Sequence, residues 1–121
     1  MNAALAAYIL PRMGAVLRMV KHPAADNVTA FGLRQRQALQ DSAWTGQWFK
    51  RAYIDKERGW IGDAKDQIST GAQSWAVLAA ALGRGGATSA NATALLSAIQ
   101  QRLRDGAPFG AKQAFCATFS I

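Results

Sequence analysis

The segment from Trp44 to Leu78 restricts the fold of this chain more than any other, because it contains all four tryptophans. Residues 46–54 are rich in side chains that favour strands, and the polar run 55–59 ends in glycine, which is typical of a turn. Trp60 then begins a second apolar piece. The pattern predicts a short β-hairpin or an extended loop near residues 46–62.

Two helical regions are predicted before this segment. Residues 1–21 have helical periodicity, with a break expected just before Pro11, because proline fits a first helical turn better than an interior. A second helix is expected from a cap at Asp26 or Asn27 to about Ser42. Its predicted buried face comprises Val28, Phe31, Ala38 and Leu39.

Two further helices are predicted in the second half of the chain. The third begins at a cap formed by Ser69 or Thr70 and ends at Gly83, and the fourth runs from about Ser89 to Arg104. The residues expected to face inward are Ile68, Ala72, Trp75, Ala76, Ala79 and Leu82 in the third helix and Ala92, Leu95, Leu96, Ile99 and Leu103 in the fourth.

These elements define a mainly-α fold class, with four to five helices in antiparallel hairpins. The length of 121 residues fits a single domain, residues 1–121, and the hydrophobic half of the composition excludes a disordered chain. Many of these hydrophobic residues are alanines, which favours close helix contacts. The tail, residues 105–121, fits either a docked strand or an irregular cover.

The formal charge of +7 permits anionic partners such as nucleic acid or an acidic protein. The basic residues are scattered, with Lys50 and Arg51 forming one of the few close pairs, so a solvated basic surface is favoured. We expect no membrane-spanning segment. The single cysteine, Cys116, excludes an internal disulfide and fits a reducing, cytoplasmic compartment.

Few residues are suited to catalysis or to metal binding. The only histidine, His22, precedes a proline and is expected in an exposed loop, and no His/Cys cluster could hold zinc. Cys116 has no basic activator nearby in sequence, so a buried structural thiol is predicted. Asp63 and Asp66 are expected to cap a helix or to be solvated. We therefore predict no catalytic residue, no metal site and no cofactor.

The tryptophans have two interpretations. A tryptophan ring can stack on the apolar face of a sugar ring while polar neighbours bind the hydroxyl groups. Polar side chains of this kind accompany the tryptophans and comprise Gln47, Arg51, Gln67 and Gln73. Alternatively, tryptophans at helix–loop junctions fill the core of a small protein. Composition alone does not separate the two.

Two sequence elements carry a resemblance to a known family. The first is Trp44-Thr-Gly-Gln-Trp48-Phe49-Lys50-Arg51-Ala-Tyr53, followed by a polar turn and Ile61-Gly62, and the second is Gln73-Ser74-Trp75-Ala76-Val77. Together they resemble the late part of the (α/α)-barrel catalytic domain of cellobiose- and chitobiose-type inverting glycoside phosphorylases, and the related module of cyclic β-1,2-glucan synthases. The resemblance covers about residues 27–104, and the second element is its most specific part.

The resemblance implies a fragment of an (α/α) barrel in which Gln73 lines a pocket, with Arg51 and Trp75 as scaffold around it. The family's general-acid aspartate lies in an upstream Trp-Asn-Asp-Gly-Met motif, which this chain lacks. The family's C-terminal phosphate-contacting segment is also missing, and the tail 105–121 looks unrelated. The chain is therefore predicted not to catalyse phosphorolysis by itself.

Two functions from different classes follow. The first is weak carbohydrate binding through the tryptophan-rich loop, for which the candidate residues are Trp48, Trp60, Gln73, Trp75 and Arg51. The second is a basic helical interaction module for an acidic protein or nucleic acid, with nucleic acid not favoured. A homodimer is also expected, because a piece of a barrel exposes apolar flanks. The candidate flanks are Met13, Val16, Leu17 and Val20 near the N-terminus and Leu95, Leu96, Ile99 and Leu103 in the fourth helix.

Overall fold

The computed structural model describes residues 2–63, 67–83, 86–105, 107, 110 and 114–115 of the chain. Within these ranges the fold is mainly helical, which confirms the predicted class. The helices are α1 (Asn2–Met19), α2 (Ala25–Ala38), α3 (Thr70–Leu78) and α4 (Ala90–Ile99), with π-helical turns at Leu39–Ala43 and Gln100–Arg104 and a 3₁₀ turn at Gly86–Thr88. The strands are β1 (Ala52–Tyr53), β2 (Trp60–Ile61), β3 (Ile68–Ser69) and β4 (Ala114–Phe115).

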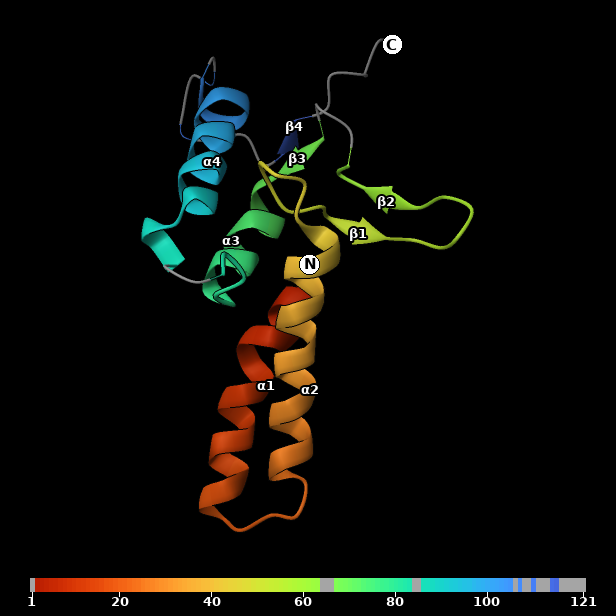
Figure 1. Cartoon of the computed structure of the whole chain (residues 1–121), viewed down its shortest axis with the longest axis vertical. Coiled ribbons are helices and arrows are strands. Elements are labelled where there is room, and N and C mark those ends of the chain that lie inside the picture. The colour runs from red at the N-terminus through yellow and green to blue at the C-terminus, as the bar shows by residue number, and fades with distance from the viewer. Residues whose placement is uncertain are drawn as a thin grey trace.

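Helices α1 and α2 form an antiparallel hairpin that projects from the rest of the protein (Figure 1). The two helices approach closely where each carries a glycine. A Cβ added at Gly32 would lie 2.6 Å from Cδ of Pro11, and one added at Gly14 would lie 3.0 Å from the carbonyl oxygen of Ala25. Only a residue without a side chain permits this approach, so the two glycines set the distance between the helices.

Pro11 lies inside α1, so the predicted break just before it is wrong. A proline inside a helix removes one backbone hydrogen bond and clashes with the preceding turn. Here the proline ring occupies the space left open by Gly32 on the facing helix. This tertiary contact offsets part of the cost, and α1 continues for 18 residues.

Helix α2 begins at Ala25, and its N-cap is Ala24, which makes no side-chain cap hydrogen bond. The predicted caps at Asp26 and Asn27 are therefore wrong. Asp26 lies in the first turn instead, where its carboxylate accepts a hydrogen bond from Nη2 of Arg18 at 2.8 Å. This ion pair joins the two helices at the tip of the hairpin, and both side chains are exposed.

The predicted buried face of α2 is only partly correct. Leu39 is buried and Val28 is half-buried, but Ala38 is exposed and Phe31 is 47% exposed. The face that packs on α1 is centred on Gly32, because a close helix contact selects small residues over large ones. Helical periodicity and side-chain size predict burial for Phe31 and give no such signal for Gly32.

The residues predicted to face inward from the third helix do so, although only some of them lie in α3. Ala72 and Ala76 of α3 are buried and Trp75 is half-buried, and Ile68 of β3 and Ala79 and Leu82 after the helix are buried as well. The regular helix ends at Leu78 rather than at Gly83, because Ala80 adopts a left-handed backbone conformation with φ of 56°. Ser69 occupies the N-cap position without a side-chain cap hydrogen bond.

Helix α4 begins as predicted. Ser89 is its N-cap and accepts a hydrogen bond from the backbone N–H of Ala92 at 3.2 Å. Leu95 and Leu103 are buried, and the π-helical turn continues the helical path to Arg104. Leu96 does not face inward as predicted, because it is 64% exposed.

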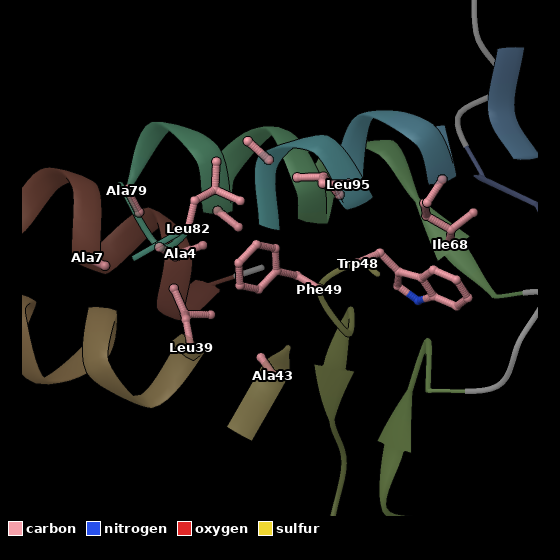
Figure 2. Packing of buried hydrophobic residues seen from close by; sticks show 14 of the residues in the cluster. Ala4, Ala7, Leu39, Ala43, Trp48, Phe49, Ile68, Ala79, Leu82 and Leu95 are labelled. Atoms are coloured by element: carbon pink, nitrogen blue, oxygen red, sulfur yellow. The ribbon is translucent and has the colours of Figure 1, made fainter. Parts of the chain in front are cut away.

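The core lies where the base of the α1–α2 hairpin meets α3, α4 and the loop after α2. Figure 2 shows Phe49 near the middle of the buried cluster, between Leu82 and Ala43. Ala4 of α1 and Leu95 of α4 belong to the same cluster. The core therefore joins both halves of the chain.

Strands β1 and β2 form the predicted hairpin, in which Ala52 pairs with Ile61 and Tyr53 with Trp60. Its turn is closed by Asp55, whose carboxylate accepts two backbone N–H groups of the turn. The other sheet pairs β3 with β4, so the described part of the tail includes a docked strand. Within the described ranges, no helix has the length and apolar character needed to cross a membrane.

Candidate functional site

Residues Trp44 to Phe49, which begin the first of the two sequence elements, form a tight loop whose two ends pair with each other. The hydroxyl of Thr45 accepts a hydrogen bond from the backbone N–H of Trp48 at 3.1 Å and donates one to its carbonyl oxygen at 2.9 Å. Gly46 adopts φ of 98°, which side chains of L-residues disfavour. Local backbone geometry thus accounts for Thr45 and Gly46 in this motif.

Trp48 is a core residue in the structure, with 3% of its surface exposed. Its indole N–H donates a hydrogen bond to the carbonyl oxygen of Gly62 at 2.9 Å. The guanidinium of Arg102 lies 4.8 Å from the centre of its ring. Trp48 therefore presents no ring face to solvent on which a sugar could stack.

Gln73 is 1% exposed and connects α3 to the loop that precedes β1. Its Oε1 accepts a hydrogen bond from the backbone N–H of Phe49 at 2.7 Å, and its Nε2 donates to the carbonyl oxygen of Phe49 at 2.9 Å. The same Nε2 donates to the carbonyl oxygen of Ser69 at 3.0 Å. We call this arrangement the Gln73 clamp. It uses the amide group for backbone contacts within the protein.

Trp75 and Trp44 pack against other aromatic rings. The ring of Trp75 lies 6.1 Å from that of Tyr8 in α1, and the ring of Trp44 lies 4.9 Å from that of Phe49. Both tryptophans are half-buried and rest against the core. Trp75 thereby joins α3 to the distant α1, and Trp44 joins the two ends of its own loop.

A cavity of about 610 Å³ opens between the start of α1, the end of α2 and the β1–β2 hairpin. We call it the hairpin groove. Its volume is within the range typical of sites for small ligands. The residues that line it are Asn2, Ala3, Ala38, Leu39, Ser42, Ala43, Lys50, Arg51, Ala52, Tyr53 and Trp60.

Two aromatic rings form the wall of the groove on the side of the β-hairpin. Tyr53 and Trp60 are opposite each other across β1 and β2, with ring centres 5.3 Å apart and an interplanar angle of 61°. Tyr53 is 52% exposed, whereas Trp60 is half-buried against the core. The groove thus has one exposed ring supported by a second ring beneath it.

Lys50 and Arg51 place positive charge beside these rings. The ammonium of Lys50 lies 5.0 Å from the centre of the Trp60 ring and 3.4 Å from a carboxylate oxygen of Asp63. Backbone hydrogen bonds fix both residues: the N–H of Lys50 donates to Ala43 at 2.8 Å, and that of Arg51 donates to Ile61 at 2.8 Å. The backbone positions of both residues are therefore set by the fold.

The structure separates the predicted site residues. It brings Arg51 and Trp60 together in the groove, and it places Trp48 and Gln73 in the core and Trp75 beside Tyr8. The groove residues that the sequence did not indicate include Lys50 and Tyr53, together with Asn2 and Ser42 from the distant helices. One sequence signal could have indicated Tyr53 as a groove residue. In the predicted hairpin Tyr53 faces Trp60, and residues that face each other across two strands lie on the same side of the sheet.

Other chemically interesting residues have ordinary surroundings. His22 lies in the exposed loop predicted for it, where its Nδ1 accepts a hydrogen bond from the backbone N–H of Ala24 at 3.1 Å. Asp63 is largely exposed and pairs with Lys50. Asp66 and Cys116 lie outside the described residues. In the part of the chain that the structure describes, no group of three or more His, Cys, Asp or Glu residues could hold a metal ion.

Comparisons of this chain with protein-family models, with curated proteins and with solved structures found no match.

Proposed function

We propose that the chain binds carbohydrate without catalysis, and that the ligand occupies the hairpin groove. The observation that supports this most directly is the Tyr53–Trp60 pair on the wall of a 610 Å³ cavity. A sugar ring has an apolar face that packs on an aromatic ring and a rim of hydroxyl groups that need hydrogen-bonding partners. Asn2, Ser42 and Lys50 also line the groove and have polar groups suited to those hydroxyl groups.

The proposal includes no catalysis, because glycosidic bond cleavage requires a carboxylic acid beside the leaving oxygen. None of the described residues that line the groove is Asp or Glu. The sequence also lacks the Trp-Asn-Asp-Gly-Met motif, which contains the general-acid aspartate in the phosphorylases that the chain resembles. We therefore interpret the chain as a phosphorylase-like helical fragment in which binding remains without turnover, in a cytoplasmic setting that its single cysteine favours.

Titration with a β-linked glucose oligosaccharide, followed by the side-chain N–H resonances of the four tryptophans, tests the site. The resonance of Trp60 should shift as ligand is added. The resonance of Trp48 should move little, because its N–H is bonded to Gly62 inside the core. Shifts confined to Trp48 or Trp75, or no shift at saturating sugar, would contradict the proposal.

The variant Tyr53→Ala provides a second test. Loss of about 60 Å² of apolar contact should weaken binding by roughly 1.5 kcal/mol, or about tenfold. Phe31→Ala is the matched control, because Phe31 is 47% exposed on α2 and does not line the groove, whereas Tyr53 is 52% exposed. Equal affinities for the two variants would exclude Tyr53 from the site.

We also propose that two copies associate through α1. Four large apolar residues, three in α1 and one just after its end, are at least 41% exposed and follow one another at intervals of four, three and four residues: Ile9, Met13, Val16 and Val20. This is the spacing of a coiled-coil seam. We call these residues the α1 seam. The fourth-helix flank supports association less, because Leu95 and Leu103 are buried there and only Leu96 is widely exposed.

A further inference from the structure

A methionine occupies one of the two central positions of the α1 seam. Met13 lies between Ile9 and Val16 in that seam and is 48% exposed. Met19, a second methionine of the same helix, is 83% exposed and lies outside the seam. Helix α1 therefore carries two accessible thioether groups, and one of them belongs to the proposed interface.

The thioether of Met13 has a reactivity that the hydrocarbon side chains of Ile9, Val16 and Val20 lack, because its sulfur is readily oxidised. A lone pair of the sulfur attacks one oxygen of hydrogen peroxide, the O–O bond breaks, and an S–O bond forms. The sulfur is oxidised by two electrons, and the second peroxide oxygen leaves as water. The product, methionine sulfoxide, is polar where the thioether was apolar.

A sulfoxide at position 13 would have no hydrogen-bond donor among the other side chains of the seam, because all three are aliphatic. The adjacent cation, Arg12, does not face Met13, since neighbouring residues of a helix point in different directions. Its guanidinium donates to the carbonyl oxygen of Tyr8 at 2.6 Å and lies 3.7 Å from the centre of the Tyr8 ring. Burial of a polar group without a hydrogen bond is unfavourable, and a two-fold dimer would bury two such groups.

Resting on the dimer proposed above, we infer that Met13 is an oxidation site that controls association of the two copies. Peroxide converts the thioether to the sulfoxide, and the oxidised chains no longer pair. The oxidant reacts with the monomer, in which Met13 is 48% exposed, because the partner covers this side chain in the dimer. Reduction of the sulfoxide by a methionine sulfoxide reductase restores the apolar seam.

Treatment with hydrogen peroxide, followed by light scattering across a dilution series, tests the inference with Met13→Leu and Met19→Leu as a matched pair. Leucine keeps an apolar side chain of similar size. The dissociation constant of the dimer should rise about a hundredfold on oxidation in the unmodified chain and in Met19→Leu, and by less than about twofold in Met13→Leu. Mass spectrometry of peptides verifies the sulfoxide at each position.

The rate of oxidation gives a second readout that does not depend on the oxidised product. In the unmodified chain, the rate at Met13 should fall at least about fivefold between a dilute sample and one that is mostly dimeric, by mass action. The rate at Met19 should stay the same. Equal rates at Met13 in the two samples, with a dimer present, would show that the interface leaves Met13 open and would overturn the inference.

The remaining outcomes separate the inference from the dimer on which it rests. A dimer that persists after Met13 is fully oxidised overturns the inference and leaves the dimer intact. Equal loss of association in Met13→Leu assigns the effect to another oxidised residue, such as Met19 or Cys116, and also overturns it. A chain that is monomeric before any treatment contradicts the dimer and the inference together.

Discussion

At the scale of single residues, the Gln73 clamp explains how a helix and a loop are held together without a sheet. A glutamine amide has the same donor and acceptor groups as a peptide bond, so Gln73 pairs with both backbone groups of Phe49 as a neighbouring strand would. Phe49 itself is 2% exposed, and its backbone groups would otherwise be buried without these partners. The side chain of Gln73 therefore supplies the two hydrogen bonds that a neighbouring β-strand would otherwise make with Phe49.

We expect Gln73→Ala to lower the free energy of unfolding by roughly 2–4 kcal/mol, because a buried N–H and a buried carbonyl lose their partners. Urea unfolding followed by tryptophan fluorescence measures this change. Gln47→Ala is the control, since Gln47 is exposed, and it should alter stability by less than about 0.5 kcal/mol. A stability of Gln73→Ala within that same margin would show that the clamp contributes little.

At the scale of elements, the contact between α1 and α2 depends on the match between Pro11 and Gly32. Each residue is unfavourable in a helix on its own, because proline lacks an N–H and glycine loses much conformational freedom. Together they bring the two helices close enough for Gly14 to meet the backbone of Ala25. Two residues that disfavour helices locally thus support the hairpin.

Gly32→Ala should destabilise the protein by about 1–3 kcal/mol, even though alanine favours helices, because its Cβ would lie 2.6 Å from the Pro11 ring. The double variant Pro11→Ala/Gly32→Ala removes the ring and should recover most of that loss. Thermal unfolding of the two variants and of Pro11→Ala completes the cycle. Additive losses would show that the ring and the new methyl group do not meet.

The elements of this fold could be predicted where sequence and local physics agree. The β1–β2 hairpin is one of the two forms predicted from Gly59 and the strand-favouring residues on both sides, and the start of α4 was predicted near Ser89. The continuation of α1 through Pro11 could not be predicted, because Gly32, which makes room for the proline ring, lies on another helix. The same limit applies to Phe31, whose size indicates burial but whose position on α2 faces away from α1.

The candidate site was predictable only in part, for a related reason. Trp60 and Arg51 lie in the segment that holds all the tryptophans, and both reach the groove. Trp48 and Gln73 are also of types that bind sugars. However, the indole of Trp48 hydrogen-bonds to the backbone of Gly62, and the amide of Gln73 hydrogen-bonds to the backbone of Phe49. Composition does not distinguish an aromatic or amide group that serves the fold from one that serves a ligand.

At the scale of the whole molecule, the protein consists of a packed body and a projecting helical hairpin (Figure 1). The body contains most of the core, and the hairpin carries the α1 seam. Covering on the order of 300–400 Å² of apolar surface on each copy would contribute several kcal/mol, which the cost of association partly offsets. The net positive charge opposes pairing only weakly at physiological salt.

We therefore expect a dimer that forms at micromolar concentrations and that is lost in Val16→Glu, since a carboxylate at the centre of the seam would be buried unpaired. Light scattering across a dilution series measures the mass. Leu96→Glu is the comparison, because Leu96 is 64% exposed on α4, outside the seam, and this variant should remain dimeric. A monomer mass for the unmodified chain at all concentrations would contradict the expectation.

The Gln73 clamp also has a consequence for exchange of backbone protons with solvent. The N–H of Phe49 lies outside every helix, and the partner that it donates to is a side chain from α3. Gln73 lies in the first turn of α3, so replacement of this N–H by deuterium requires that turn to separate from the loop. Its exchange rate should therefore match those of the amides in the same turn of α3, which makes one loop proton a measure of the stability of the contact between α3 and the loop.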